Sequence, residues 1–151
     1  MRPYFNQQKF RVTYNQCFSE VIYQCGKVPR KGQAGTWLNQ DLIDAFTDLN
    51  FRGYAHSVEV WNRDDMLVGG LYGMALGKVF FGESMFSLES NASKYGFISL
   101  VRKLHSIGVQ LIDCQQETKH LESLGAKNIS RDEFMNHIND LNVLSLSKIV
   151  L

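Results

Sequence analysis

Three strand-like runs joined by short polar turns occupy the middle of the sequence and limit its possible folds more than any other feature. Residues 56–61 alternate apolar and polar side chains, residues 62–65 have turn chemistry, and residues 66–76 continue as a second run. Residues 79–87 form a third run after Gly77 and Lys78. Runs joined by such short turns pair with their neighbours, so the sequence predicts an antiparallel meander of three strands. Gly69 and Gly70 in the second run predict a bulge or a close backbone approach.

Helical segments flank this meander on both sides. A strand over residues 10–14 precedes a helix that we expect to begin after an Asn15 N-cap, and a second helix follows Asn39 and ends at Gly53. Downstream we expect a helix from about Ser93 to residue 108, a strand over 109–115, a short helix over 119–124 and a last helix with a capping box at 130–133. The predicted class is α+β, with helices covering a mostly antiparallel sheet. This order of elements resembles that of the GNAT acyltransferase superfamily.

Composition excludes several classes of protein. The 151 residues fit a single domain over 1–151, and no apolar run approaches the ~20 residues of a membrane-spanning helix. The first residues lack the order of a secretory signal, so we expect a cytoplasmic protein. The 3 cysteines have no CxxC spacing, which argues against both a disulfide framework and a zinc site. A net charge of +1 predicts no strong field for a polyanion, although a local basic patch stays possible.

Two polar features stand out against this background. Glu83 lies in an apolar, phenylalanine-rich run, where a carboxylate needs a partner or must face outward. Asp113 and Gln115 are two residues apart in the predicted strand over 109–115, so they would project side by side from one face. A carboxylate could then orient the amide for general-base assistance, or the pair could be a solvated strand end. Four histidines lie in predicted strands or helices without an acid and nucleophile set, and we interpret them as structural: His56, His105, His120 and His137.

Seven blocks of sequence resemble the bacterial leucyl/phenylalanyl-tRNA-protein transferase family. The blocks span about residues 10–140 and lie at 35–37, 53–61, 67–73, 81–87, 91–94, 111–115 and 123–126. They correspond to the carboxy-terminal, GNAT-like domain of that family, and we expect the amino-terminal domain to be absent from this chain. The resemblance implies transfer of Leu or Phe from aminoacyl-tRNA to a protein with an N-terminal Arg or Lys, which enters the bacterial N-degron pathway.

The resemblance also implies roles for individual residues. Asp113 and Gln115 match the proton relay that activates the attacking amine, and Glu83 matches a position beside the donor's own amine. Seven residues match positions around the side-chain pocket or its rim: Trp37, Leu71, Phe80, Met85, Phe97, Leu100 and Leu104. The leucines at 71, 100 and 104 differ in type from familiar members of the family. An aminoacyl ester is already activated, so we expect no metal and no cofactor.

Two further functions stay open at this stage. The first is an acyl-CoA-dependent N-acetyltransferase, which would need a glycine-rich loop around a pyrophosphate at a helix start, whereas residues 87–93 contain no glycine. The second is a catalytically idle or repurposed interaction domain, because the missing amino-terminal domain would carry the basic helix for the tRNA acceptor arm. Six cations offer a replacement for that helix: Arg2, Lys9, Arg11, Lys27, Arg30 and Lys31.

Overall fold

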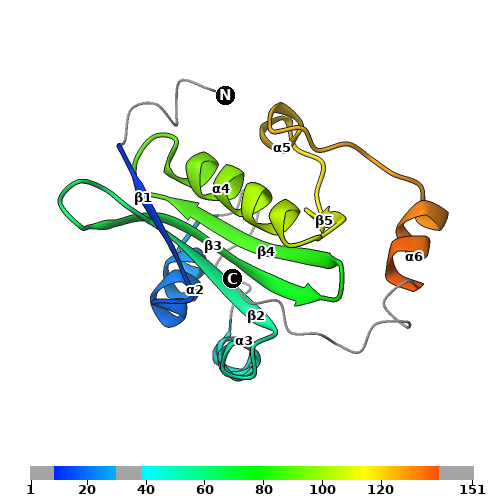
Figure 1. The fold of residues 1–151 in the computed structure, drawn as a ribbon. Coiled ribbons are helices and arrows are strands. Elements are labelled where there is room, and N and C mark those ends of the chain that lie inside the picture. The colour runs from blue at the N-terminus through cyan, green and yellow to red at the C-terminus, as the bar shows by residue number, and fades with distance from the viewer. Residues whose placement is uncertain (1–8, 30–38, 140–151) are drawn as a thin grey trace.

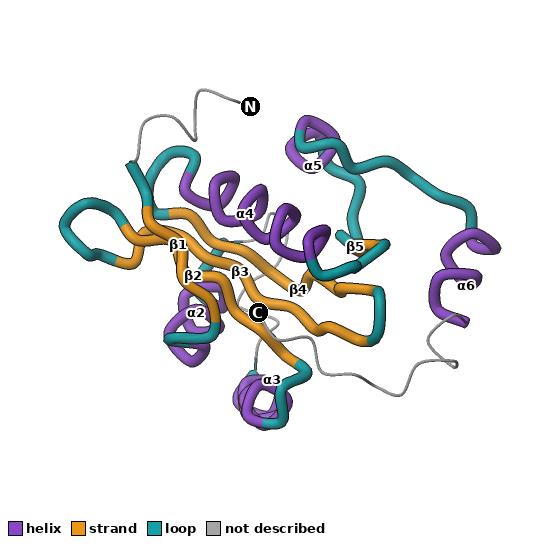
Figure 2. Tube along the Cα trace, in the orientation of Figure 1, coloured by secondary structure: helices purple, strands orange, loops and turns teal. Residues whose placement is uncertain are grey.

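The computed structural model describes residues 9–29 and 39–139 and contains a five-stranded sheet with the strand order β1-β2-β3-β4-β5 (Figures 1 and 2). The strands are β1 (Arg11–Tyr14), β2 (Ala55–Trp61), β3 (Leu67–Leu76), β4 (Val79–Ser87) and β5 (Leu111–Asp113). Pairing is antiparallel from β1 to β4, and β5 joins β4 in parallel. The predicted meander over residues 56–87 is therefore confirmed, within a mostly antiparallel sheet.

Helices cover both faces of the sheet (Figure 1). The helix α4 (Ala92–Ser106) crosses one face, while α2 (Phe18–Gly26) and α3 (Gln40–Phe51) lie on the other. The short α5 (Lys119–Ser123) follows β5, and α6 (Arg131–Asn139) lies at the periphery, where none of its residues is buried. Among residues 9–29 and 39–139, no helix combines the length and the apolar character needed to cross a membrane.

Local sequence signals account for most of the helix ends. The Asn39 side chain accepts a hydrogen bond from the Leu42 N–H, as an N-cap does, and Gly53 has a φ of 86° that ends α3. The predicted N-cap of α2 is wrong. The cap position is Cys17, because Asn15 adopts a φ of 56° and its side chain accepts a hydrogen bond from the Ser57 N–H of β2 instead. Asn15 therefore ties the end of β1 to the sheet.

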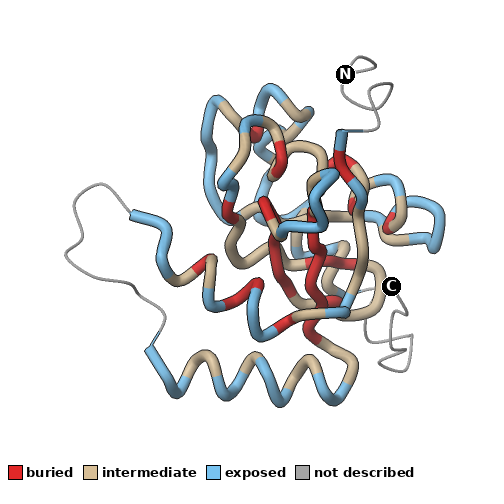
Figure 3. Tube along the Cα trace, turned by 90° about the vertical axis from the view of Figure 1, so that its left-hand side faces the viewer, coloured by how far each residue is buried: buried red, intermediate tan, exposed pale blue. Residues whose placement is uncertain are grey.

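The core lies in two layers, one on each side of the sheet, and the buried residues follow the strands and the sheet-facing sides of α2 and α4 (Figure 3). The α2 side packs Phe18, Val21, Ile22 and Cys25 against Tyr72 and Phe86. The α4 side packs a second cluster: Val58, Leu71, Ala75, Phe80, Phe97, Leu100, Leu104 and Leu121. This second cluster forms the apolar base of the candidate site described below.

The glycine pair in β3 permits close approach and lies beside a one-residue bulge. A Cβ on Gly69 would lie 2.8 Å from the Cβ of Ala92, and a Cβ on Gly70 would lie 2.8 Å from the Val58 carbonyl oxygen. One register shift lies directly beside the pair, because Val60 is opposite Gly69 and Trp61 is opposite Leu67, which leaves Val68 of β3 without a partner on β2. A second shift falls between Tyr72 and Gly73. Both alternatives predicted for Gly69 and Gly70 agree with the structure, since the close approach occurs at both glycines and a register shift begins at Gly69.

Replacing Gly69 by alanine is expected to lower the free energy of unfolding by ~1–3 kcal/mol, the range for overpacked sites. The new methyl group would meet backbone at the start of α4, since the Ala92 carbonyl carbon would lie only 3.1 Å from it. Urea denaturation followed by circular dichroism measures the change. Gly82→Ala is the matched control, because the atom nearest to its new methyl group, the Asp113 carbonyl oxygen, would lie 3.4 Å away. Equal stability of the two variants would contradict this account.

The strand β2 is buried on both faces, which leaves Glu59 fully buried with 0% exposure. Its carboxylate accepts hydrogen bonds from Thr13 Oγ1 at 2.7 Å, Ser57 Oγ at 2.5 Å and the Cys17 N–H at 3.4 Å. Cys17 is the N-cap of α2, so the positive end of the helix dipole also favours the negative charge. Glu59 is thus satisfied by donors alone and joins β1, β2 and α2.

Replacing Glu59 by glutamine is expected to lower the free energy of unfolding by ~1–3 kcal/mol, the cost of a buried polar group without a partner. The amide nitrogen would face hydroxyl and N–H groups that now donate to a carboxylate oxygen. Glu20→Gln provides the control, because Glu20 is exposed on the first turn of α2. Comparable urea midpoints for the two variants would argue against the network.

Candidate functional site

The candidate site lies where β4 and β5 separate. The two strands pair in parallel from Val79 and Leu111 to Phe81 and Asp113, after which β5 ends and β4 continues. At the same level the register between β3 and β4 shifts, because Tyr72 is opposite Ser84 and Gly73 is opposite Gly82. Glu83 lies between Gly82 and Ser84 on β4 and has no partner residue on β3, so it is the bulged residue of β4. The bulge leaves its carboxylate half-buried at the opening between the strands.

Gln115 reaches Glu83 across this opening. The strand β5 ends at Asp113, and Gln115 follows it with a φ of 61° and an exposed side chain. The prediction that residues 113 and 115 project from one strand face is therefore wrong. Asp113 instead accepts a hydrogen bond from the Gln115 backbone N–H at 2.8 Å, and Gln115 Nε2 donates to Glu83 Oε1 at 3.3 Å. Asp113 orients Gln115 through the backbone, while the amide side chain contacts Glu83.

The environment of Glu83 disfavours its charged form. Partial burial raises the pKa of this carboxyl above its usual range, the hydrogen bond from Gln115 opposes that rise, and the charge of Asp113 adds to it. Carboxyl groups with raised pKa values occur often in functional sites, and a cation beside such a group favours its charged form. A protonated amine is such a ligand.

A cavity of about 690 Å³ opens beside Glu83. Its lining includes six other residues that the sequence analysis assigns to the site: Leu71, Phe80, Met85, Phe97, Leu100 and Gln115. Phe80 and Leu100 are almost completely buried, at 1% and 0% exposure, so the floor of the cavity is rigid and apolar. Its size lies within the ~300–1,000 Å³ of typical ligand pockets, and its polar lining on the β4–β5 side includes Glu83, Ser84, Gln115 and Gln116.

A second cavity, of about 1,030 Å³, adjoins the first and is bordered by β5, α5 and α6. Asp113 and Leu104 line this second cavity and not the first. Gln115 lines both, so it stands at their junction. Trp37, the remaining predicted residue, lies outside the described residues.

Several residues of the first cavity are not predicted from the sequence as site residues. Thr118, His120 and Leu121 enter from α5 and its N-cap, and Cys114 enters from the end of β5. The α5 residues follow a predicted strand by a few positions, but only the packing of Leu121 into the α4-side core brings them to the cavity. Burial raises the pKa of the Cys114 thiol and the charge of Asp113 adds to it, so this cysteine is no activated nucleophile.

The cations proposed as a replacement for a tRNA-binding helix are engaged elsewhere where the structure describes them. Lys9 lies 3.5 Å from Glu89, Arg11 lies 2.8 Å from Asp65, and Lys27 lies over the Tyr23 ring. Arg2, Arg30 and Lys31 lie outside the described residues. Within residues 9–29 and 39–139 no cluster of three potential metal ligands occurs.

Sequence comparison connects this geometry to a family. The profile of the family described as leucyl/phenylalanyl-tRNA protein transferase matches residues 1–139. This chain belongs to that family. A leucyl/phenylalanyl-tRNA–protein transferase from Christiangramia forsetii is 58% identical over 137 residues, which are 89% of this chain and 64% of that protein. One from Pseudomonas fluorescens Pf0-1 is 53% identical over 132 residues, which are 87% of this chain and 58% of that protein.

The chain thus spans about 58–64% of the length of these relatives. Structural comparison supports the fold class independently. A GNAT-family acetyltransferase from Staphylococcus aureus Mu50 superimposes with a TM-score of 0.54 at 10% identity, covering 82% of this chain and 87% of that one. At this identity the likeness concerns the fold alone, and it agrees with the predicted α+β, GNAT-like arrangement.

Proposed function

We propose that this chain acts in the aminoacyl transfer that moves Leu or Phe from aminoacyl-tRNA to the α-amine of a protein beginning with Arg or Lys. The observation that carries the proposal is the half-buried Glu83 carboxylate, in hydrogen-bond contact with Gln115, beside an apolar cavity of about 690 Å³. The aminoacyl ester of Leu-tRNA or Phe-tRNA presents this combination of a free α-amine and an apolar side chain. The donor implies a cytoplasmic reaction, and the product is a substrate for N-degron degradation.

In the proposed reaction the acceptor amine attacks the ester carbonyl. A C–N bond forms, the bond from the carbonyl carbon to the ribose oxygen breaks, and the proton of the amine ends on that oxygen. Glu83 binds the donor's amine, and the Asp113–Gln115 pair, which the family resemblance implies as a proton relay, orients the acceptor amine. Asp113 keeps Gln115 in its left-handed conformation, which presents the amide at the junction of the two cavities. Such positioning supplies effective molarities of up to roughly 10⁵–10⁸ M.

Replacing Leu100 by phenylalanine is expected to lower the preference for Phe over Leu as donor by roughly tenfold, the scale of one or two extra methylenes in a pocket. Leu100 is fully buried and lines the first cavity, so the larger ring narrows the space beside Phe80 and Phe97. Competition between Phe-tRNA and Leu-tRNA measures the ratio. Val101→Phe makes a comparable change one residue along α4, where the side chain lines the second cavity only, and should leave the ratio unchanged.

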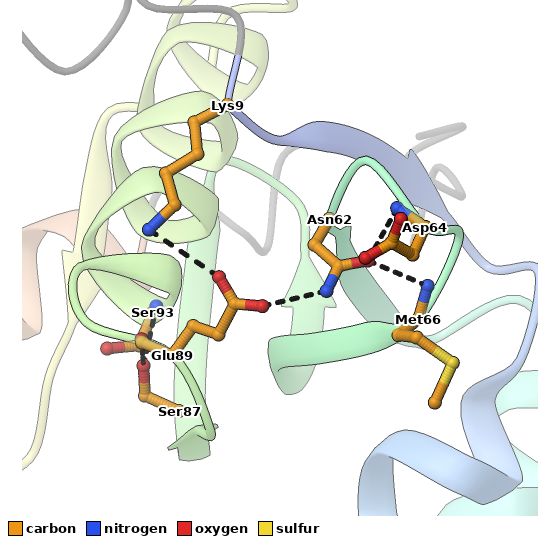
Figure 4. Close-up of polar contacts among 7 residues, drawn as sticks. All are labelled: Lys9, Asn62, Asp64, Met66, Ser87, Glu89 and Ser93. Atoms are coloured by element: carbon orange, nitrogen blue, oxygen red, sulfur yellow. Dashed lines mark hydrogen bonds and ion pairs between the residues drawn. The ribbon is translucent and has the colours of Figure 1, made fainter.

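The acyl-CoA alternative is disfavoured by the start of α4. The Ser93 N–H donates to Ser87 Oγ at 3.2 Å, and the Glu89 carboxylate lies between Lys9 and Asn62 (Figure 4). The Ser93 N–H is therefore not free to bind a pyrophosphate, and the Glu89 carboxylate adds negative charge near the start of α4.

One assay tests the proposal against both alternatives. The chain is incubated with an Arg-initiated peptide and either labelled Phe-tRNA, labelled Leu-tRNA or acetyl-CoA, and the peptide is analysed by mass. Transfer from aminoacyl-tRNA alone supports the proposal, and acetylation would replace it with the acyl-CoA function. Absence of any transfer by the folded chain, together with absence of tRNA binding, would identify an idle interaction domain.

A further inference from the structure

The proposed reaction leaves one proton without a base. An amide oxygen can accept a hydrogen bond, but it is far too weak a base to hold a proton, so Gln115 can orient the attacking amine and no more. Glu83 accepts a hydrogen bond from Gln115 and faces the donor's amine in the proposed complex. Asp113 accepts from the Gln115 backbone and lines the second cavity. The first cavity therefore needs a further group that can exchange a proton near neutral pH.

A histidine that the sequence analysis interprets as structural lies in that cavity. His120 lines the first cavity together with Glu83 and Gln115. It belongs to α5, which follows β5 in the sequence, whereas Glu83 belongs to β4, which precedes β5. Its helix is held firmly: the Leu121 N–H donates to the Thr118 N-cap at 3.1 Å, and Ser123 Oγ donates to the His120 carbonyl at 2.6 Å. The imidazole thus sits on an anchored turn at the edge of the cavity.

The imidazole of His120 is available as a base. Within the described part of the chain neither ring nitrogen makes a hydrogen bond, whereas His56 Nδ1 is bonded to Asn15 at 3.0 Å. Burial lowers the pKa of His120 below 6.5, and the charge of Lys94 on α4 lowers it further. The ring is therefore neutral at pH 7 and can accept a proton.

Other titratable groups around the ring have different roles or states. Glu83 of β4 and the Cys114 thiol line the same cavity, and Lys119 and Glu122 flank His120 within α5. The pKa values of Glu83 and Cys114 are both raised by burial, so the thiol stays protonated at pH 7. Lys94 of α4 acts on the ring through its charge.

We propose that His120 accepts the proton that the attacking α-amine loses and delivers it to the ribose oxygen that leaves. The C–N bond forms as the amine proton passes to the imidazole, and the bond from the carbonyl carbon to the ribose oxygen breaks as the imidazolium returns that proton. The imidazole is neutral again at the end of each cycle, so no further reactant is needed. The assignment rests on the proposed aminoacyl transfer and names the base that serves it.

The test compares His120→Gln with wild type and with His105→Gln, a control at an exposed histidine on α4. Glutamine keeps size and hydrogen bonding but cannot carry a proton. Transfer of Phe from Phe-tRNA to an Arg-initiated peptide is measured from about pH 5 to about pH 8, a range that includes the ordinary pKa of histidine and of α-amines. We expect His120→Gln to lower kcat on the order of 10²-fold with KM values for both substrates nearly unchanged.

The pH profile separates a base from a merely structural residue. Below the pKa of the acceptor amine, log kcat/KM should rise with pH with a slope of one, because only the neutral amine attacks. Below the pKa of His120 the slope should increase to two, because the imidazole must also lose its proton. We expect the extra slope in wild type and His105→Gln and its loss in His120→Gln. A variant with unchanged kcat or an unchanged profile would overturn the assignment, whereas failure of the wild type to transfer would overturn the proposed function itself.

A binding measurement tests the position of the ring without any turnover. Phenylalanyl-adenosine 3′-amide, which cannot transfer its amino acid, is added while the imidazole resonances are followed by NMR. We expect the His120 resonance to shift with donor binding and the His105 resonance to stay unchanged. Saturable binding of the amide that leaves His120 unperturbed would contradict its place beside the reacting ester.

Discussion

Replacing Asp113 by alanine is expected to lower kcat for aminoacyl transfer by on the order of 10²-fold while leaving the Kd for phenylalanyl-adenosine 3′-amide within about threefold of wild type. Asp113 accepts the Gln115 N–H at 2.8 Å and lines the second cavity, so it does not contact the space beside Glu83. Its removal frees Gln115 from a left-handed backbone conformation with a φ of 61°, which a residue with a side chain rarely adopts unsupported. The amide would then leave the junction of the cavities.

Asp113→Asn separates position from charge in the same experiment. The Asn side-chain oxygen can still accept the Gln115 N–H, so we expect kcat to recover to within about tenfold of wild type, since the hydrogen bond and not the charge fixes the turn. Single-turnover transfer and equilibrium binding of the amide are measured side by side for both variants. Equal loss of binding and transfer in Asp113→Ala would contradict a role confined to the acceptor amine.

The sequence predicts the arrangement of elements well because the decisive signals are local. Short turns fix the pairing of β2, β3 and β4. Asn39 begins α3 as its N-cap, and Gly53 and Gly108 follow the ends of helices with left-handed geometry. Asn15 shows where this logic stops. Its side chain suits an N-cap, but the hydrogen bond from Ser57 in β2 comes from residues far away in the sequence. A distant strand decides which local option the residue takes.

The candidate site residues follow from the family resemblance, whereas the local sequence pattern does not predict their geometry. Glu83 stands out as an acid that needs a partner, but the bulge that exposes it comes from the register between β3 and β4, which no local pattern encodes. The strand predicted over 109–115 is too long, because β5 ends at Asp113 and the turn at Gln115 is held by a side chain. Only that turn gives Gln115 its contact with Glu83.

Burial of polar groups is the least predictable property. The alternation in β2 indicates a strand but not that helices cover both faces, so nothing local marks Glu59 as the fully buried acid of the sheet. His120 has the same limitation. Its helix is short, and only the packing of Leu121 into the α4-side core places the imidazole in the cavity. Tertiary contacts, and not periodicity, decide which polar side chains face a site.

Replacing Glu83 by glutamine is expected to weaken binding of phenylalanyl-adenosine 3′-amide by roughly tenfold to a hundredfold, a moderate loss because a half-exposed ion pair contributes less than a buried one. The folding stability should not fall. The pKa of Glu83 is raised in the folded protein, so the folded state binds this proton more tightly than the unfolded chain does. The ionised carboxylate therefore destabilises the fold at pH 7, and its contribution worsens as pH rises through that pKa. Glutamine removes this cost, so the melting temperature at pH 7 should stay equal or rise.

The same linkage predicts how donor binding depends on pH. Binding of the amide to wild type should weaken as pH falls through the raised pKa of Glu83, since only the carboxylate attracts the donor's ammonium group. Glu83→Gln should bind weakly at every pH and lack this acidic limb. Glu117→Gln is the matched control, because Glu117 accepts from Asn128 and lines only the second cavity. The ligand-free protein should tolerate the loss of a carboxylate whose role is to bind a ligand. A Glu83→Gln variant that loses stability and affinity together would therefore show that Glu83 supports the fold and does not hold the donor.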